Sequence, residues 1–354
     1  MRYSQRPMVP LTLFLLVAIA ASGCRAVDES SAIGSRLLVD FGPVGNDQAR
    51  RNIDLFGKSL DDEFVSRQSG RRAVLLTGFN PFGGEGSSAS SSNISGELIS
   101  HMEQRDRAAG SVVLEREGGG ARIARTTSKI NGEEVDVYYF RGNTTYVTPA
   151  LIQVATQKIG PNRVINFGQG PQNMIETGAS NSTFVGAKSY DENGRVIPIL
   201  TNQSSRVDES KPAEGTTPLS WNPSRITGPT GFPAAPGARP ENDYICNATA
   251  KVLAETMQGR EVKYLDGVTL SPIKKPENGD MKHTFIHIAP NQDLNKLDSV
   301  TRDVLAESFK DAPPTTVTPA TPSSPSTGST PSSSTPGTTG TSTPAPGGSS
   351  SVPR

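Results

Sequence analysis

The chain has 354 residues, and its 35 basic and 35 acidic side chains give a formal net charge of zero at pH 7. This balance argues against a nucleic-acid-binding protein, in which a basic stripe is expected. Two cysteines exclude a disulfide scaffold, and with three histidines they leave almost no ligands for a Cys/His zinc cluster. The length would allow two domains of roughly 150 residues. The composition of the two ends of the chain reduces the expected number of folded domains to one.

The first residues have the pattern of an export signal. Arg2 and Arg6 precede an apolar run over residues 11–21, which is shorter than the roughly 20 residues of a membrane-spanning helix. The following Ser-Gly-Cys, with Ala21 before it, resembles a bacterial lipobox, in which Cys24 would be acylated and become the first mature residue. Two or three acyl chains would anchor the protein stably in a lipid bilayer. Ordinary signal cleavage is the alternative, because Ala21 stands where leucine is more usual.

The expected location of the protein is the cell envelope. Arg25 follows the cysteine in place of aspartate, which favours the outer membrane facing the periplasm, or the cell surface. We expect residues 1–23 to be a lipoprotein signal peptide and residues 24–72 to be an anchor spacer with an N-terminal helix. That helix is predicted over residues 47–66, where one face carries Ile53, Phe56, Leu60 and Phe64.

The other end has low complexity. Residues 313–354 are almost entirely Ser, Thr, Pro and Gly, so they cannot form a buried core. We predict a disordered, proline-stiffened tail. A spacer that interacts with the cell wall and a solvated extension with no partner are both open. The folded domain is therefore expected over residues 73–312, and the sequence leaves its oligomeric state open.

Between the two ends, apolar runs alternate with helical patterns. The runs that we interpret as buried strands are 73–77, 135–140, 164–167, 262–265 and 284–288. Helical periodicity is found in residues 151–159, 250–257 and 294–309. This alternation predicts a single α/β domain, phosphorylase/hydrolase-like, whose mostly parallel twisted sheet has helices on both faces. Residues 186–243, rich in Gly, Pro, Ser and Asn, are predicted to be long loops.

Functional groups of such a sheet collect where strands end. The first candidate loop is Thr-Gly-Phe-Asn-Pro-Phe-Gly-Gly at residues 77–84. It lacks the Lys-Ser/Thr of a phosphate-binding P-loop and the Gly-x-Gly-x-x-Gly spacing of a dinucleotide site. Phe79 and Phe82 indicate the wall of a small apolar pocket, and simple packing of the two rings under a turn is the alternative.

Cys246 is the second candidate, just before a helical pattern. If Cys24 is acylated, Cys246 is the one thiol of the mature chain. A free thiol exported to an oxidising compartment is a liability unless it is buried or used. A helix N-terminus favours the thiolate, and a neighbouring imidazolium would lower the pKa of the thiol further. A buried structural cysteine is the alternative.

The third candidate is His287, a polar ring inside the apolar run 284–288, where burial requires a hydrogen-bond partner. A lone cysteine, a histidine at a strand end and an orienting acid are what a Cys-His-acid nucleophile needs. His283 would share the same strand face and is the fallback base. A satisfied core histidine is the alternative for His287, and we expect His101 to be solvated on a polar helix.

Together these segments resemble the pyroglutamyl-peptidase I family. Residues 75–84 resemble its opening motif, strand-Thr-Gly-Phe-x-Pro-Phe-Gly-Gly, and Tyr-Ile-Cys-Asn at 244–247 resembles its nucleophile motif. Phe-Ile-His-Ile at 285–288 is similar to its histidine strand, and residues 167–181 are similar to the segment with its acidic triad member. The four segments occur in the family's order. The resemblance spans residues 73–310.

The resemblance implies a thiol exopeptidase that hydrolyses the amide bond after an N-terminal pyroglutamate through a thioester. Its implied triad is Cys246, His287 and Glu176. Its implied substrate-binding residues are Phe79 and Phe82, which would flank the pyrrolidone ring, and Gln169, which would pair with the lactam amide. The partner is then a peptide with an N-terminal pyroglutamate, and neither a metal nor an organic cofactor is implied.

Departures from the family pattern keep two alternatives open. The segment between Gly168 and Glu176 is short and lacks the arginine usual there, Asn80 stands where glutamate is more common, and residues 186–243 are compressed. The chain would then be a catalytically impaired, cell-envelope lipoprotein that binds pyroglutamyl or related peptide ends. Hydrolysis of a different amide is the other alternative.

Overall fold

The central sheet of the computed structural model joins eight strands among the described residues. Their order is β11 (Ala234–Ala235), β6 (Met174–Glu176), β14 (Lys282–Ile288), β5 (Arg163–Gln169), β1 (Arg72–Phe79), β4 (Glu133–Gly142), β3 (Ala121–Ile130) and β2 (Leu114–Gly118). Strands β14, β5, β1 and β4 are parallel, β6 is antiparallel to β14 and parallel to β11, and β3 and β2 pair in antiparallel fashion. The predicted mostly parallel sheet is confirmed.

The structure describes residues 45–68, 70–81, 92–182, 189–190, 196–197, 206–212, 216–221, 234–235, 245–264, 268–276 and 280–310. The predicted signal peptide with Cys24, the pocket residue Phe82 and the predicted tail 313–354 lie outside these residues. Among the helices described, none has the length and apolar character that a bilayer crossing requires.

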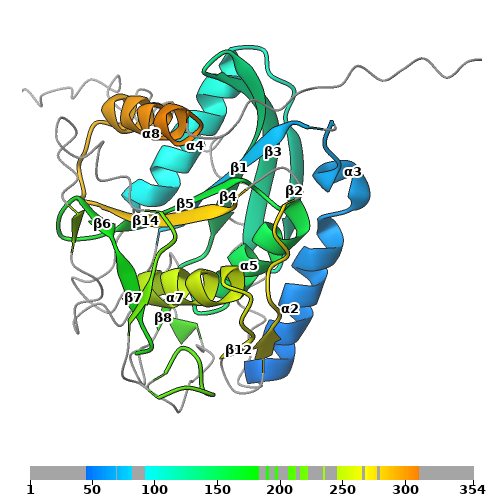
Figure 1. Cartoon of the computed structure of the whole chain (residues 1–354), viewed down its shortest axis with the longest axis vertical. Coiled ribbons are helices and arrows are strands. Elements are labelled where there is room, and N and C mark those ends of the chain that lie inside the picture. The colour runs from blue at the N-terminus through cyan, green and yellow to red at the C-terminus, as the bar shows by residue number, and fades with distance from the viewer. Residues whose placement is uncertain are drawn as a thin grey trace, which may run out of the picture. The chain divides into compact units, whose positions relative to one another are not determined.

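Helices cover both faces of the sheet, as the alternation of strands and helices predicted (Figure 1). One face packs against α4 (Ile94–Ala108) and α8 (Leu294–Ser308), and the other against α2 (Gly45–Ser59), α5 (Thr148–Ile159) and α7 (Ile245–Met257). Successive strand residues point to opposite faces, so Leu76 of β1 faces α4 and Leu75 faces α5. Both are buried, and each such side chain contributes about 1.5–3 kcal/mol relative to exposure.

Three elements differ from the sequence prediction. The N-terminal helix over 47–66 is two helices, α2 and α3 (Asp62–Val65), because the Asp61 carboxylate accepts the Phe64 N–H and starts a new helix. Residues 262–264 form β12, but β12 pairs only with β13 (Val268–Leu270), outside the main sheet. The β2–β3 hairpin was not predicted, because its partly exposed residues lack a continuous apolar run.

The predicted loop region 186–243 contains several short strands where the structure describes it. They are β8 (Ser189–Tyr190), β9 (Val196–Ile197), β10 (Thr216–Pro218) and β11. Strand β10 pairs with β7 (Gly178–Ser180), which follows β6 in the chain. The part of this region next to α7 is therefore an ordered extension of the strands around Glu176.

Candidate active site

His287 and Glu176 meet across the antiparallel strands β14 and β6. His287 is opposite Met174 and Phe285 is opposite Glu176, so the His287 and Glu176 side chains are diagonal neighbours on one face of the sheet. The Nε2 atom of His287 lies 2.9 Å from Oε1 of Glu176, and both side chains are buried. The structure thus brings together two of the three residues of the predicted triad in direct contact.

Cys246, the second residue of α7, lies against the end of β5. A Cβ atom added to Gly168 would come within 2.7 Å of Cys246 Sγ and 2.9 Å of the Phe285 ring. Only glycine fits at this position. Since Gly168 is opposite His287 in the parallel pairing of β5 with β14, the thiol lies beside the strand pair that carries the imidazole.

The second ring nitrogen of His287 faces the same segment of β5. A Cβ atom added to Gly170 would lie 2.8 Å from His287 Nδ1. The imidazole therefore has Nε2 toward the Glu176 carboxylate and Nδ1 toward Gly170, two residues along β5 from Gly168, against which the Cys246 thiol lies. This arrangement suits a base that takes a thiol proton at Nδ1 while a carboxylate holds the opposite nitrogen.

The electrostatics of the thiol differ from the sequence expectation. Burial is the larger cause and the negative charge of Glu176 the second, and together they raise the pKa of Cys246 to about 12. The helix N-terminus does not offset them. At neutral pH the resting thiol is therefore protonated, and a thiolate requires transfer of its proton to a base during the reaction.

The surroundings of Cys246 are apolar. Phe79 is buried and belongs to one hydrophobic cluster with Cys246, Phe285 and Ala179. The Phe285 ring also lies 5.1 Å from the His287 ring, centroid to centroid. Phe79, one of the two predicted pocket residues, thus packs in the same cluster as the candidate nucleophile.

Gln169 lies at the carboxyl end of β5, and its side chain is engaged by α4. Its Oε1 accepts the backbone N–H of Ile94, the first residue of that helix, at 3.1 Å. Strand alternation places Gln169 on the opposite side of β5 from Gly168. The structure therefore places the Gln169 side chain on the side of β5 away from Gly168 and the Cys246 thiol, with its Nε2 amide as the remaining hydrogen-bond donor.

His283 is not placed to act as the fallback base. It is fully buried, and its Nε2 lies 2.7 Å from Nδ2 of Asn166, whose Oδ1 accepts the Thr77 hydroxyl. Desolvation lowers the pKa of His283 to about 3. Four residues of strand separate it from His287, about 13 Å, so it is a neutral core histidine.

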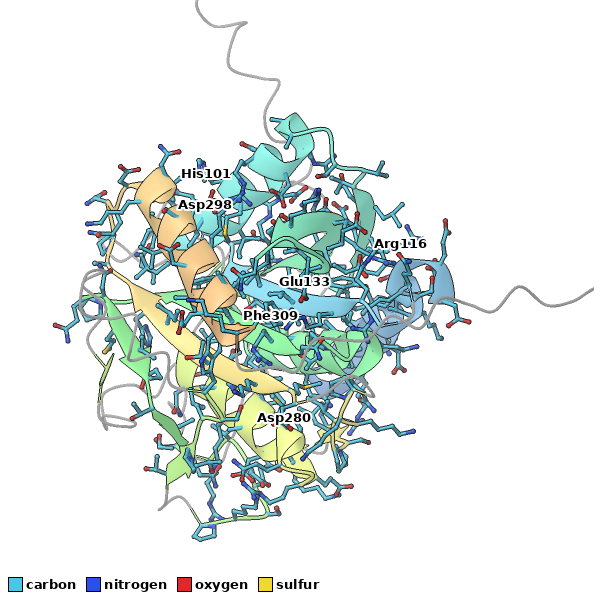
Figure 2. All side chains as sticks on the ribbon, turned by 45° about the horizontal axis from the view of Figure 1, so that its top comes forward. His101, Arg116, Glu133, Asp280, Asp298 and Phe309 are labelled. Atoms are coloured by element: carbon cyan, nitrogen blue, oxygen red, sulfur yellow. The ribbon has the colours of Figure 1, made fainter. Side chains whose placement is uncertain are left out.

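His101 is also placed differently from the expectation. It is half-buried rather than solvated, and its Nε2 lies 4.0 Å from Asp298 of α8 (Figure 2). Among the described residues, no group of three or more His, Cys, Asp or Glu side chains is arranged to hold a metal ion.

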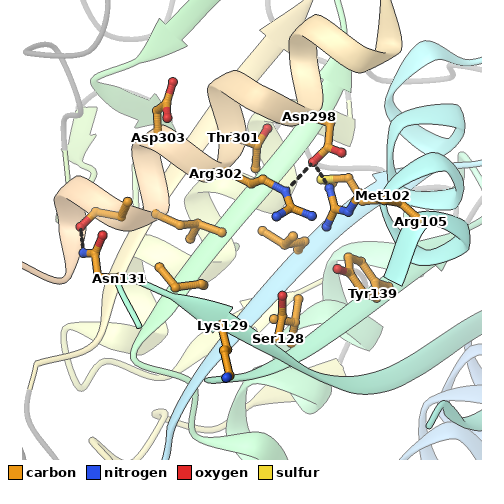
Figure 3. Close-up of a pocket in the computed structure, with 15 residues that line it drawn as sticks. Met102, Arg105, Ser128, Lys129, Asn131, Tyr139, Asp298, Thr301, Arg302 and Asp303 are labelled. Carbon is orange, nitrogen blue, oxygen red and sulfur yellow. Dashed lines mark hydrogen bonds and ion pairs between the residues drawn. The ribbon is translucent and has the colours of Figure 1, made fainter. Parts of the chain in front are cut away.

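A cavity of about 190 Å³ lies between α4, α8 and the β3–β4 hairpin (Figure 3). Its floor includes Leu76, on the face of β1 opposite to Phe79, so the cavity and Cys246 are on different sides of the sheet. Asp298 forms ion pairs with both Arg105 and Arg302 on its wall. The Asp298 carboxylate offsets part of the positive charge of these two arginines, and the cavity contains none of the predicted triad.

No protein-family model matches this chain, and no curated protein matches it either. Among solved structures, it is similar to a pyrrolidone carboxyl peptidase from Thermococcus litoralis, with 16% identity and a TM-score of 0.44, covering 67% of this chain and 94% of that one. It is also similar to pyroglutamyl peptidase I from Bacillus amyloliquefaciens, with 20% identity and a TM-score of 0.41, covering 67% and 94%. A mutant pyrrolidone carboxyl peptidase from Pyrococcus furiosus gives 14% identity, a TM-score of 0.44 and coverages of 68% and 99%.

Proposed function

We propose that this chain is a cysteine peptidase with Cys246 as nucleophile, His287 as base and Glu176 as the acid that orients the imidazole. The observation that carries the proposal is the buried contact of 2.9 Å between His287 Nε2 and Glu176 Oε1, with the Cys246 thiol against Gly168, the residue of β5 opposite His287. A carboxylate in contact with an imidazole, and a thiol packed on the neighbouring strand, are the parts that acyl transfer needs.

The reaction starts from the neutral thiol. His287 Nδ1 takes the proton of Cys246 as Sγ attacks the scissile carbonyl, and Glu176 stabilises the imidazolium that forms. The imidazolium then gives its proton to the leaving amine as the C–N bond breaks, which leaves a thioester on Cys246. Water attacks the thioester with His287 as base, the acid product leaves, and the thiol is restored.

We propose an N-terminal pyroglutamate as the acyl group, on the basis of the motifs around Phe79, Phe82, Cys246 and His287. The pyrrolidone ring is flat and largely apolar, which suits the cluster of Phe79 with Cys246. Its lactam carbonyl needs a donor, and the Nε2 amide of Gln169 at the end of β5 is the donor proposed, although its side chain starts on the face of β5 opposite to Gly168. A site that hydrogen-bonds the lactam would reject a proline-like ring strongly, because the polar groups of the site would then be unpaired.

One observation favours the binding alternative. Burial together with Glu176 raises the pKa of Cys246 to about 12, and a thiol protonated to that degree is unreactive unless His287 accepts its proton. If that transfer fails, the same pocket would bind pyroglutamyl peptide ends without cleaving them.

The test is release of a fluorescent amine from a pyroglutamyl amide by the purified protein under reducing conditions. We expect turnover by the wild type and its loss in Cys246→Ala and His287→Ala. Absence of turnover by the folded wild type would overturn the peptidase proposal, and calorimetric binding of pyroglutamate in that case would support the binding alternative.

We also propose that acylated Cys24 anchors the protein to a bilayer of the cell envelope, at the outer membrane or the cell surface. The proposal rests on the lipobox-like Ser-Gly-Cys of residues 22–24. Labelled fatty acid should be incorporated into the wild type and not into Cys24→Ala. Continued labelling of the variant would remove Cys24 from this role.

A further inference from the structure

Helix α7 carries a buried polar stripe next to its apolar face. Asn247, Lys251 and Glu255 are spaced four residues apart, so they lie on one side of the helix. All three are buried, with exposed fractions of 2%, 3% and 2%. A buried polar side chain must be matched by partners, and the stripe finds them in the segments that follow Glu176.

The Asn247 side chain hydrogen-bonds to the backbone at the end of β7, as the backbone of a neighbouring strand would. Its Oδ1 accepts the Ser180 N–H at 3.0 Å, and its Nδ2 donates to the Ser180 carbonyl at 3.1 Å and the Ser182 carbonyl at 2.8 Å. One side chain thus pairs with both backbone groups of Ser180. The contact fixes the start of α7 against β7 in one register.

The two ends of this contact are adjacent to two members of the proposed triad. Asn247 directly follows Cys246, and β7 begins two residues after Glu176. We propose that Asn247 is a positioning residue, which holds the thiol of Cys246 in register with the Glu176–His287 pair. This inference rests on the proposed function. It adds to the proposed mechanism a residue that touches none of the reacting atoms.

The rest of the stripe has a different partner. Lys251 Nζ donates to the Thr217 hydroxyl at 2.6 Å and lies 2.9 Å from Glu255, which in turn pairs with Lys211 at 2.6 Å. These contacts dock β10 and residues 206–212 on α7, further from Cys246. Removing either charge would leave the other buried and poorly compensated, so these residues do not make clean test positions. Asn247 is neutral, so its substitution leaves no buried charge unpaired and gives a cleaner test.

Asn162 provides a control. It is another buried asparagine, directly before β5, and its Oδ1 accepts the Ala73 N–H at 3.0 Å. Its truncation removes a buried hydrogen bond to the backbone at the start of β1 and β5. Cys246 lies against Gly168, at the other end of β5, so Asn162→Ala should lower stability without moving Cys246.

The experiment compares Asn247→Ala, Asn247→Leu and Asn162→Ala in the full chain. The Leu variant keeps the approximate size of Asn247 and adds no charge, but it loses the acceptor and the donors that bind Ser180 and Ser182. We expect kcat on a pyroglutamyl amide to fall by about 100-fold in both Asn247 variants, with KM unchanged because ground-state binding is untouched. Asn162→Ala should keep the wild-type kcat while losing thermal stability.

A spectroscopic readout separates this inference from the proposed function. In protein labelled with ¹⁵N-histidine, the Nε2–H signal of His287 reports its contact with Glu176, and the chain has three histidines in all. The signal should move in the Asn247 variants and stay in Asn162→Ala, whether or not the wild type turns over substrate. An unmoved signal or wild-type kcat in folded Asn247→Leu, or an equal effect of Asn162→Ala, would overturn the positioning role. If Asn247→Ala does not fold, Asn247→Leu decides.

Discussion

The carboxylate of Glu176 lies 2.9 Å from Nε2 of His287, and these residues come from neighbouring strands that run in opposite directions. Their diagonal positions on one face of the sheet set this contact. Because the carboxylate holds the Nε2 proton, Nδ1 is the nitrogen left to exchange a proton with a thiol. The same carboxylate raises the pKa of the nearby Cys246, so Glu176 has two effects of opposite sign on thiolate formation.

Glu176→Gln should separate these two effects. Loss of the negative charge removes one cause of the raised pKa of Cys246, so the pKa should fall and alkylation by iodoacetamide should reach its midpoint at a lower pH than in the wild type. Catalysis should nevertheless fall by roughly 10²–10⁴-fold, because the imidazole loses its orienting partner. A midpoint that stays in place or moves to higher pH would contradict the assigned proximity.

Gly168→Ala should disturb the thiol directly. The added methyl group would lie 2.7 Å from Cys246 Sγ and 2.9 Å from the Phe285 ring, so one of these groups must shift. We expect a loss of about 1–3 kcal/mol in the free energy of unfolding from overpacking, and a fall in kcat. Chemical denaturation and turnover measure the two effects.

Gly57→Ala in α2 is the matched control for that variant. Its added methyl group would meet only Val154 Cγ1, at 3.4 Å. Since alanine is the better helix former by about 0.5–1 kcal/mol, this variant should be as stable as the wild type or more so. If Gly168→Ala were equally harmless, the close approach of β5 to the thiol would be wrong.

His283 should give the protein an acid-sensitive stability. Its pKa is lowered from 6.5 to about 3 in the folded chain because it is desolvated. Below pH 6.5 the His283 side chain therefore binds a proton in the unfolded chain but stays neutral in the folded chain. The contribution of His283 is complete above pH 6.5 and is lost as the pH falls toward 3, by roughly 3–5 kcal/mol at the acid end.

The comparison variant is His283→Gln, which keeps an acceptor for Asn166 and does not titrate. It should be less stable than the wild type at pH 8 because the fit is poorer. Its free energy of unfolding should decline less steeply between pH 6.5 and 3. Parallel stability profiles of the two proteins would show that His283 is charged or exposed in the folded state.

The sequence was sufficient for the parallel centre of the sheet, whereas the candidate triad that it indicated stays a prediction. Buried parallel strands have continuous apolar runs, which is why residues 73–77, 135–140, 164–167 and 284–288 could be recognised as β1, β4, β5 and β14. The residues of a strand do not specify which other strand it pairs with. Residues 262–264 therefore looked like another strand of the main sheet, although they pair in a separate hairpin.

The properties that the sequence could not supply depend on contacts between distant segments. A helix N-terminus predicts a lowered pKa for Cys246, but burial and Glu176 reverse the sign. The tight fit of Gly168 against the thiol and the pairing of Asn247 with Ser180 are defined only once α7 is packed on β5 and β7. Neither Gly168 nor Asn247 lies in a local sequence pattern that predicts such a role.

The central claim is that Cys246 forms a thioester with a pyroglutamyl group, and mass spectrometry of an acid-quenched reaction tests it most directly. With an activated pyroglutamyl ester as substrate, we predict a pyroglutamyl adduct on the peptide that contains Cys246, greatly slowed in formation by His287→Ala and absent from Cys246→Ala. An adduct on another residue, or ester turnover that survives in Cys246→Ala, would contradict the account.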